Sequence, residues 1–302
     1  MKEENWRVWV NGEMLAWKDA KISVFDRSFQ YGDGVFEGMR CYDGRIFKLK
    51  EHTERLFRSA RMLGIEIPMS EEAFSEAVKE VLRVNDFRDA HIKPVVSRGT
   101  AWKLGLDPRN TTAPNIVIPA RPIGKSMFDA EKGFKLASVS VRKVPAMCLD
   151  PRVKSCNYLV HILARTEALA AGADEAIIYD IHGYVSEGCG DNIFLVKDGA
   201  LYTPKVQDAL QGITRETVIE LAERDGLKVH QRRLTSYDIY TADEVFVTGS
   251  GAGIIAVSEV DKREVSGGRM GAVTKALSRR YDEESKKGEA VFEDEMEQEG
   301  VK

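Results

Sequence analysis

The chain has few cysteines, no long uninterrupted apolar run and no strong excess of charge of either sign. Its apolar runs fall short of the ~18 residues that a membrane-spanning helix needs, and residues 1–5 lack the apolar core of a signal peptide. The four cysteines show neither C-x-x-C spacing nor a paired framework, which fits free thiols in a reducing compartment. We therefore expect a cytoplasmic protein with no disulfide and no metal site.

The charge balance is close to neutral, with a net charge of -4 and an isoelectric point near 5.9. Such a chain offers no basic field that would attract nucleic acid or an anionic membrane. Its 302 residues, 43% of them apolar, are enough for a large buried core and for about two domains. These properties favour an enzyme that acts on small molecules, with neither nucleic acid nor a membrane as partner.

The first part of the chain mixes strand and helix patterns. Alternating apolar residues and turn signals such as Asn11-Gly12 predict strands at 6–10, 13–16, 36–42, 45–49, 91–97 and 115–119. An amphipathic helix that carries Leu56 and Ala60 lies between them, and a second helix opens at Ser70. From 121 to 133 the apolar periodicity fades, so we predict a linker there.

The second part repeats this mixture, and the fold class predicted for the whole chain is α+β with two lobes and mixed, largely antiparallel sheets. Strands are expected at 134–141, 175–179, 193–196 and 201–203, with helices at 158–171 and from Thr214 to Gly226. The predicted domains are 1–120 and 134–281, and residues 282–302 are expected to form a charged, solvated tail.

Two segments suggest a pyridoxal phosphate (PLP) site. PLP chemistry needs an amine that forms a Schiff base with the cofactor aldehyde and a carboxylate that keeps the ring nitrogen protonated. Lys154, in Lys-Ser-Cys-Asn-Tyr, would be the amine, and Glu187, in Tyr-Val-Ser-Glu-Gly, would be the carboxylate. Taken alone, Lys154 also fits a solvated surface charge, and Lys143 is the nearest competing amine. Cys156 and Cys189 lie close by in sequence and are expected to be small buried hydrophobic residues.

The cofactor phosphate needs backbone amides, and two segments could supply them. Gly212-Ile213-Thr214 leads into a helix whose first amides could bind an anion. A glycine-rich turn at 248–253 follows an apolar strand and could present amides and the Ser250 hydroxyl. A dinucleotide-binding loop is the alternative, but the chain lacks the βαβ unit with a downstream acidic residue that this fingerprint requires.

Six stretches of the chain occur in the order and spacing found in class IV aminotransferases. They are Phe36-Glu37-Gly38-Met39-Arg40, His52-Thr53-Glu54-Arg55-Leu56, Lys154 with Asn157-Tyr158, Tyr184-Val185-Ser186-Glu187-Gly188, Gly212-Ile213-Thr214-Arg215 and the glycine-rich turn. From about Trp6 to about Arg280 the chain resembles this family of PLP fold type IV, and most of all its branched-chain amino acid aminotransferases.

The resemblance implies roles for individual residues. Lys154 would be the Schiff-base lysine and proton shuttle, Glu187 the partner of the pyridinium nitrogen, and Tyr158 the partner of the phenolic oxygen. The phosphate would be bound by a further set, Arg55, Ile213, Thr214, Ser250 and Gly251. For Arg55 the alternative is a solvated charge on a helix surface.

Substrate recognition is expected to involve a strand near the start of the chain. By strand alternation, Phe36, Gly38 and Arg40 face one side, and together they offer an aromatic surface, open space and a cation. The resemblance adds Tyr31 from the neighbouring subunit of a homodimer. The remaining candidate substrate contacts are Lys93, Arg98 and Ala252.

The sequence departs from the branched-chain pattern at two places, and these leave alternatives open. His91-Ile92-Lys93 stands where many branched-chain enzymes have an aromatic residue, Ile and Arg, and Arg98-Gly99-Thr100 resembles the carboxylate-anchoring loop of D-amino acid aminotransferases. The leading hypothesis is an L-branched-chain aminotransferase that uses 2-oxoglutarate. The others are a D-amino acid or (R)-amine aminotransferase, a lyase acting on aminodeoxychorismate and a non-catalytic anion-binding module.

Overall fold

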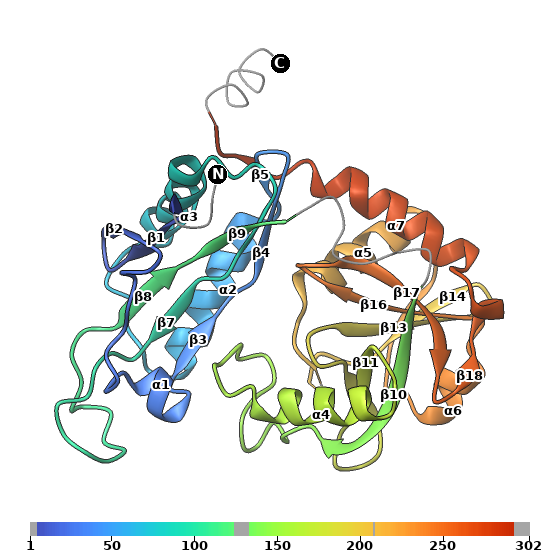
Figure 1. Ribbon diagram of the computed structural model, residues 1–302. Coiled ribbons are helices and arrows are strands. Elements are labelled where there is room, and N and C mark those ends of the chain that lie inside the picture. Colours follow the sequence, from blue (N-terminus) through green and yellow to red (C-terminus); the bar gives the residue numbers. More distant parts are fainter. Residues whose placement is uncertain (1–4, 124–132, 208, 293–302) are drawn as a thin grey trace. The chain divides into compact units, whose positions relative to one another are not determined.

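The computed structural model describes residues 5–123, 133–207 and 209–292 and divides the chain into two compact units (Figure 1). Unit 1 comprises Met1–Lys125, Val153–Asn157 and Ser285–Lys302, and unit 2 comprises Ser126–Arg152 and Tyr158–Glu284. The chain therefore returns to unit 1 at 153–157. A single boundary at 121–133, as predicted from the sequence, does not account for this return. Most of that predicted linker, 124–132, lies outside the described residues.

In its described residues, unit 1 contains two five-stranded antiparallel sheets and three helices. The strand orders are β2-β1-β8-β7-β3 and β19-β5-β4-β6-β9. The strands are β1 Arg7–Val10, β2 Glu13–Ala16, β3 Gly34–Phe36, β4 Met39–Tyr42, β5 Arg45–Ile46, β6 Ala90–Ile92, β7 Val95–Ser97, β8 Asn115–Ile118, β9 Ala120–Pro122 and β19 Glu289–Ala290. The helices are α1 Arg27–Tyr31, α2 Leu49–Met62 and α3 Glu71–Asn85.

Two predicted strands of unit 1 are interrupted, and a third break separates β8 from β9, so the strands divide between two sheets. The expected strand 36–42 breaks at Glu37–Gly38 and the strand 91–97 at Lys93–Pro94, and β8 ends before Pro119. Proline has no backbone N–H and cannot donate to a ladder. At the breaks the Glu37 N–H donates to the Pro94 carbonyl at 2.9 Å, and the Lys93 N–H donates to the Pro119 carbonyl at 3.0 Å. Uninterrupted strands were therefore a wrong prediction at 36–42 and 91–97, while the strand predicted at 115–119 is found as β8.

Helices α2 and α3 cover one apolar core of unit 1. Helix α3 begins after Ser70, whose hydroxyl accepts a hydrogen bond from the Ala73 N–H, as the capping pattern predicted. The inward side chains of the two helices include Leu56 and Phe74, both fully buried. Each such side chain contributes roughly 1.5–3 kcal/mol when it is removed from water. This core supports the strands that carry the candidate substrate-binding residues.

Unit 2 is built on a nine-stranded mixed sheet, with helices α4, α5 and α7 flanking its strands (Figure 1). The strand order is β12-β11-β10-β17-β16-β13-β14-β15, and β18 pairs with β17. The strands are β10 Phe134–Arg142, β11 Glu175–Tyr179, β12 Val185–Glu187, β13 Asn192–Lys197, β14 Ala200–Thr203, β15 Val229–Gln231, β16 Glu244–Gly249, β17 Gly253–Val260 and β18 Arg263–Glu264. The helices are α4 Leu159–Ala170, α5 Ile213–Arg224, α6 Ser236–Tyr240 and α7 Ala272–Ser285, with a 3-10 turn at Ser266–Gly268.

The pairing in unit 2 explains how its helices are placed. Strand β10 is parallel to both of its neighbours, β11 and β17, while β13, β16 and β17 are joined by antiparallel ladders. Helix α4 connects β10 to β11 and packs on them through small residues, with Ala164 and Ala168 against Ala137. Small side chains allow the helix to approach the sheet closely. The predicted mixed, largely antiparallel α+β fold is confirmed.

The predicted charged tail was wrong for part of its length. Helix α7 continues to Ser285, and β19 pairs with β5 in unit 1. Val291 follows β19 and is fully buried, and its carbonyl accepts a hydrogen bond from Arg83 Nε at 2.7 Å. The short apolar pair Ala290-Val291 therefore anchors a segment whose charged composition suggested solvent. Residues 293–302 lie outside the described part of the chain. Among the described helices, none has the length and apolar character that crossing a membrane requires.

Candidate active site

Lys154 is held by backbone pairing to strand β3 in unit 1. The Phe36 N–H donates to the Lys154 carbonyl at 3.0 Å, and the Cys156 N–H donates to the Gly34 carbonyl at 2.8 Å. These bonds attach the segment 153–157 to the sheet edge and fix the backbone from which the Lys154 side chain extends. Its Nζ lies over the Phe36 ring, 4.7 Å from the ring centroid. Lys154 is thus placed beside the first residue of the predicted substrate wall.

Lys93 approaches the same aromatic ring. Its Nζ lies 5.2 Å from the centroid of Phe36, so two cationic side chains share this ring. Along the chain, Phe36, Gly38 and Arg40 are partly exposed while the residues between them are buried, which is the alternation expected from the sequence. The structure therefore brings Phe36, Lys93 and Lys154 together, and it presents Gly38 and Arg40 on the same partly exposed side.

His91 lies against Gly38. A Cβ added to Gly38 would lie 3.2 Å from His91 Nε2, so only glycine leaves this imidazole its full room. Burial, followed by the charges of Lys93 and Arg40, lowers the pKa of His91 to about 4. His91 is consequently neutral at pH 7, and the positive charge around Gly38 comes from its neighbours.

Arg55 is not a solvated charge, because only 6% of it is exposed. It forms two hydrogen bonds with Glu37, from Nε to Oε1 at 2.6 Å and from one terminal nitrogen to Oε2 at 2.8 Å. His52 Nδ1 lies 2.8 Å from the same Oε2. Burial raises the pKa of Glu37, but the charges of Arg55 and His52 outweigh it and hold the pKa well below its ordinary value. The surface alternative for Arg55 was therefore wrong, and its contact with phosphate stays a prediction.

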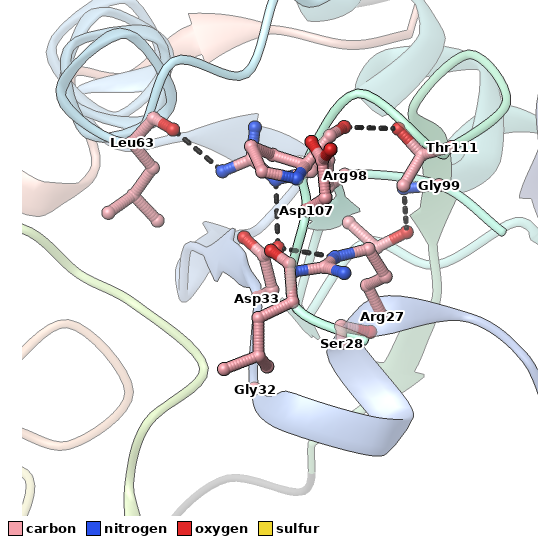
Figure 2. A network of polar contacts seen from close by, with 12 residues as sticks. Arg27, Ser28, Gly32, Asp33, Leu63, Arg98, Gly99, Asp107 and Thr111 are labelled. Carbon is pink, nitrogen blue, oxygen red and sulfur yellow. Dashed lines mark hydrogen bonds and ion pairs between the residues drawn. The ribbon is translucent and has the colours of Figure 1, made fainter. Parts of the chain in front are cut away.

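Arg98 forms an internal network in unit 1 (Figure 2). Its Nε donates to Asp33 Oδ2 at 2.8 Å, and its terminal nitrogens donate to the carbonyls of Leu63 and Gly64 at 2.7 and 3.0 Å. Arg27 Nε binds the same Asp33 oxygen at 2.7 Å. Burial raises the pKa of Asp33, but side-chain hydrogen bonds from the two arginines outweigh it, so the pKa is lowered. Arg98 thus ties the end of α2 to the loop after β7.

Tyr31 ends helix α1 and is 42% exposed. The helix begins at Asp26, whose side chain accepts from the Ser28 N–H, and ends at Gly32 in a left-handed conformation. The Arg27 guanidinium carbon lies 5.2 Å from the Tyr31 ring centroid. Within its own unit, Tyr31 therefore keeps part of its ring at the surface.

Glu187 ends strand β12 in unit 2 and is nearly buried, with 5% exposed. Lys143 Nζ contacts Glu187 Oε1, and the Leu210 N–H donates to Oε2 at 2.9 Å. Burial raises the pKa of this carboxyl, but the Lys143 charge and these hydrogen bonds outweigh it, so the pKa lies below its ordinary value. Glu187 is an anion at neutral pH, as a partner for a protonated ring nitrogen must be.

Tyr158 and His161 lie at the start of α4 and stack on each other. The two ring centroids are 4.5 Å apart and the ring planes differ by 17°. His161 Nε2 is 3.1 Å from Lys143 Nζ, which connects this pair to Glu187. Sequence reasoning named Lys143 only as a competing amine and did not name His161. The i to i+3 spacing of Tyr158 and His161 was the available signal that the two share a helix face.

The two expected phosphate-binding segments of unit 2 meet at Asn192. A Cβ added to Gly212 would overlap Asn192 Oδ1, and Asn192 pairs with Thr248 across β13 and β16. Helix α5 begins after Gly212 with no side chain capping its first amides. The Thr248 hydroxyl oxygen is buried with no hydrogen-bond partner among the described residues. Uncapped amides and an unsatisfied hydroxyl are the donors that a phosphate requires, so this cradle fits the group.

Further residues lie along these two segments. The Thr214 hydroxyl lies 3.4 Å from the hydroxyl of Tyr281, a fully buried residue of α7 that sequence reasoning did not assign to the site. Ile213 opens α5. Ser250, Gly251 and Ala252 form the turn between β16 and β17, and all three are partly exposed.

The two cysteines near the site have unreactive surroundings. Burial raises the pKa of Cys156 to about 11, and burial with a hydrogen bond to Glu175 raises the pKa of Cys189 well above its ordinary value. Because the thiolate is the reactive form, both thiols are poor nucleophiles at neutral pH.

Comparisons with known proteins agree with this geometry. The family model for amino-transferase class IV matches residues 34–260, which include the strand at Phe36, Lys154, Glu187 and the glycine-rich turn. The chain belongs to the class IV aminotransferases. This family uses PLP, and the enzyme is therefore a PLP-dependent aminotransferase of fold type IV.

Relatives and solved structures place this aminotransferase near one group. It is 47% identical over 290 residues to a putative branched-chain-amino-acid aminotransferase of Methanocaldococcus jannaschii, covering 95% of this chain and 100% of the relative. The solved branched-chain amino acid aminotransferase of Escherichia coli superposes with a TM-score of 0.89 at 36% identity, covering 92% and 94% of the two chains. A T.th. branched-chain amino acid aminotransferase complexed with N-(5'-phosphopyridoxyl)-L-glutamate gives a TM-score of 0.88 at 38% identity, covering 93% and 94%.

Proposed function

We propose that this aminotransferase transfers the amino group of an L-branched-chain amino acid to 2-oxoglutarate. The main observation is the environment of Phe36, whose aromatic ring is approached by both Lys93 and Lys154, while Gly38 nearby in the chain leaves room that only His91 borders. An apolar wall suits a branched side chain, and a nearby cation suits the distal carboxylate of a dicarboxylic acceptor. The L-glutamate adduct in the T.th. enzyme supports the same acceptor and configuration.

In the proposed mechanism PLP supplies an aldehyde for the amino group and a ring that withdraws electrons. With PLP bound, Lys154 Nζ would be the base that takes the α-proton of the donor and the acid that gives a proton back. Glu187 would hold a proton on the ring nitrogen, because its carboxylate is anionic and buried. The amides at the start of α5 and in the turn after β16, with the Thr214 and Ser250 hydroxyls, would bind the phosphate.

The surroundings of Arg98 weigh against a D-amino acid or (R)-amine donor. In that alternative Arg98 would anchor the substrate carboxylate, yet its guanidinium donates to Asp33 and to the Leu63 carbonyl (Figure 2), and also to the Gly64 carbonyl. Taking it away from those partners would leave a largely buried carboxylate with less compensation. We therefore assign Arg98 to the support of unit 1 and place the substrate contacts at Phe36, Gly38, Arg40, Lys93 and Ala252.

A homodimer with shared active sites is part of the proposal. Helix α4 exposes an apolar face at Leu159, Ile162 and Leu163, each at least half exposed. In unit 1, Phe29 is 70% and Tyr31 is 42% exposed. A second copy of this chain would remove such side chains from water. We propose that Tyr31 enters the substrate pocket of the neighbouring subunit.

A matrix of amino donors and 2-oxo acids tests the substrate assignment. Both enantiomers of leucine and alanine, together with (R)-1-phenylethylamine, are assayed with 2-oxoglutarate and with pyruvate on the wild type and on Arg98→Ala. We expect L-leucine with 2-oxoglutarate to give the highest kcat/KM, and we expect Arg98→Ala to keep the L over D preference. A wild type that prefers D-alanine or (R)-1-phenylethylamine would disprove the assignment.

The lyase alternative is tested in the same series. Aminodeoxychorismate is supplied without any 2-oxo acid, and pyruvate release is followed. We expect no pyruvate above the level of a Lys154→Ala control. Release at a rate similar to transamination would instead assign the protein to the lyase reaction.

A further inference from the structure

Lys143 has two specific side-chain partners within unit 2. It directly follows β10, where its N–H donates to the Tyr179 carbonyl at 2.9 Å, and this bond fixes its position beside β11. Its Nζ contacts Glu187 Oε1 and lies 3.1 Å from His161 Nε2. Only 11% of the Lys143 side chain and 6% of the Glu187 side chain are exposed. The ammonium is therefore held in a largely buried position.

The second nitrogen of His161 determines which way the hydrogen bond to Lys143 runs. His161 Nδ1 lies 2.8 Å from the Cys189 carbonyl oxygen, which can only accept. Nδ1 must therefore carry the proton, and in the neutral imidazole Nε2 is an acceptor. The Lys143 ammonium donates to that lone pair and, through another N–H, to Glu187. The Cys189 carbonyl thus fixes the His161 tautomer that Lys143 needs.

Glu187 keeps accepting capacity beyond these contacts. One oxygen accepts from Lys143 and the other from the Leu210 N–H. A carboxylate has about four lone-pair sites, so each oxygen can still accept one further hydrogen bond. A buried carboxylate without its cation would instead tend to take up a proton itself. In that form it would no longer hold a proton on a neighbouring ring nitrogen.

We propose that Lys143, held in place by His161, is a positioning residue that keeps Glu187 anionic and aimed at the cofactor ring nitrogen. The inference rests on the role proposed above for Glu187. His161 also stacks on Tyr158 at a centroid distance of 4.5 Å. The His161 imidazole therefore contacts both Lys143, which pairs with Glu187, and Tyr158, the proposed partner of the cofactor's phenolic oxygen. Neither Lys143 nor His161 needs to contact substrate for this function.

Matched variants separate this role from simple support of the fold. Lys143→Met keeps the length of the side chain and removes its charge, while Lys143→Arg restores a cation. His161→Phe keeps an aromatic ring against Tyr158 but removes the acceptor, and His161→Gln supplies an amide acceptor. Lys135→Met, on the same strand β10, removes an exposed lysine that is paired with Glu259 and serves as the control. Glu187→Gln is the reference for loss of the carboxylate.

The measurement is the nitrogen-15 chemical shift of ring-labelled PLP bound to each variant, which reports protonation of the ring nitrogen directly. Cofactor affinity, thermal unfolding of the apoprotein and the rate of the L-leucine half-reaction accompany it. We expect Lys143→Met to move the signal toward that of Glu187→Gln and to slow the half-reaction by at least about tenfold. Lys143→Arg should return both to near the wild-type values, and Lys135→Met should change neither.

His161→Phe should move the signal in the same direction by less, and His161→Gln should restore it. If Lys143→Met does not fold, His161→Phe and Lys143→Arg still carry the test. A wild-type ring signal in both Lys143→Met and His161→Phe would disprove the inference, even if the variants were less stable. A wild-type signal in Glu187→Gln would disprove the proposed role of Glu187, and the inference would fail with it.

Discussion

A buried carboxylate stays ionised only when cations and donors surround it, and two glutamates of this enzyme show how that is achieved. Glu37 has Arg55 and His52, and Glu187 has Lys143 and the Leu210 N–H. In both cases burial raises the pKa of the carboxyl, but the partners lower it by more, so the net pKa lies below its ordinary value. Each cluster therefore places a permanent negative charge at a defined point of its unit.

At the residue scale, the first prediction concerns Lys154. The purified enzyme is expected to be yellow, and Lys154→Ala should lose both the colour and transamination, because backbone bonds to β3 hold this amine beside Phe36. Borohydride reduction followed by peptide mapping should find the cofactor on Lys154. Lys143→Met is the control and should keep the label. A label on Lys143, or on no lysine, would contradict the assignment.

The second prediction concerns Glu37 and pH. Its pKa lies below the ordinary value of 4.5, so its charge stabilises the fold above that pH, and this stabilisation is lost as the pH falls below it. Glu37→Gln leaves the buried Arg55 without its charged partner and should cost about 3–5 kcal/mol of unfolding free energy at pH 7. Urea unfolding at several pH values should show the difference from wild type narrowing below pH 4.5.

A neighbouring glutamate gives the control for this pH series. Glu54 is on α2, next to Arg55 in the chain, and pairs with Arg58 on the surface, where 62% of the arginine side chain is exposed. Glu54→Gln should therefore change the unfolding free energy by less than about 1 kcal/mol at any pH. A Glu37→Gln variant as stable as Glu54→Gln at pH 7 would mean that the buried ion pair contributes nothing to the fold.

The sequence was enough to predict the reactive residues, but not the residues that hold them in position. Lys154 and Glu187 were predicted because PLP chemistry calls for one amine and one carboxylate in recognisable local motifs. Lys143 and His161 come from different elements, and their contact with each other and with Glu187 depends on the pairing of β10, β11 and β12. Nothing local to either residue indicates such a contact, so only the folded chain identifies it.

At the element scale, the breaks in the strands of unit 1 shape the proposed substrate wall. β3 and β4 belong to different sheets, and the residues between them include Gly38, the smallest part of the wall. Pro94 and Pro119 in the sequence could have indicated two of the three breaks. The third, at Glu37, follows from its burial against Arg55, which the sequence alone does not reveal.

The third prediction tests the phosphate cradle at the start of α5. Gly212→Ala should displace Asn192, whose amide nitrogen donates to the Leu210 carbonyl at 2.9 Å, because the new methyl group would overlap Asn192 Oδ1. The segment that leads from Leu210 into α5 should shift with it. We expect PLP affinity, measured by equilibrium dialysis, to fall at least about tenfold, as for loss of one or two charge-assisted hydrogen bonds.

A second glycine near the cradle provides the control. A Cβ on Gly190 would meet no atom within 4 Å, so Gly190→Ala should bind PLP within about twofold of wild type. Equal affinities for Gly212→Ala and Gly190→Ala would show that the start of α5 does not hold the phosphate.

At the scale of the whole molecule, the residues proposed for the site belong to both units. Unit 1 carries Lys154 and the proposed substrate wall at Phe36, and unit 2 carries Glu187 and the proposed phosphate cradle. The sequence predicted two lobes, but it could not predict that residues 153–157 join unit 1. That short segment has no periodicity of its own, and its place is set by backbone pairing with β3.

The last prediction tests whether Tyr31 acts in the neighbouring subunit. Lys154→Ala and Tyr31→Ala are prepared separately, and each homodimer is expected to have little activity with L-leucine. If Tyr31 reaches across the dimer, a mixed dimer has one site that receives Lys154 from one chain and Tyr31 from the other. Co-refolding equal amounts should then restore about a quarter of the wild-type activity, since about half of the dimers are mixed and each has one complete site.

The same mixture also distinguishes the opposite arrangement. If Tyr31 serves the site of its own subunit, every site in a mixed dimer lacks either Lys154 or Tyr31, and activity stays at the level of the parent variants. Light scattering is used to confirm that the mixture is dimeric, because a monomer would also fail to recover activity. The 42% exposure of Tyr31 within its own unit, beside the 70% exposure of Phe29, is the reason to expect recovery. A dimeric mixture without recovery would contradict the shared site while leaving the proposed reaction intact.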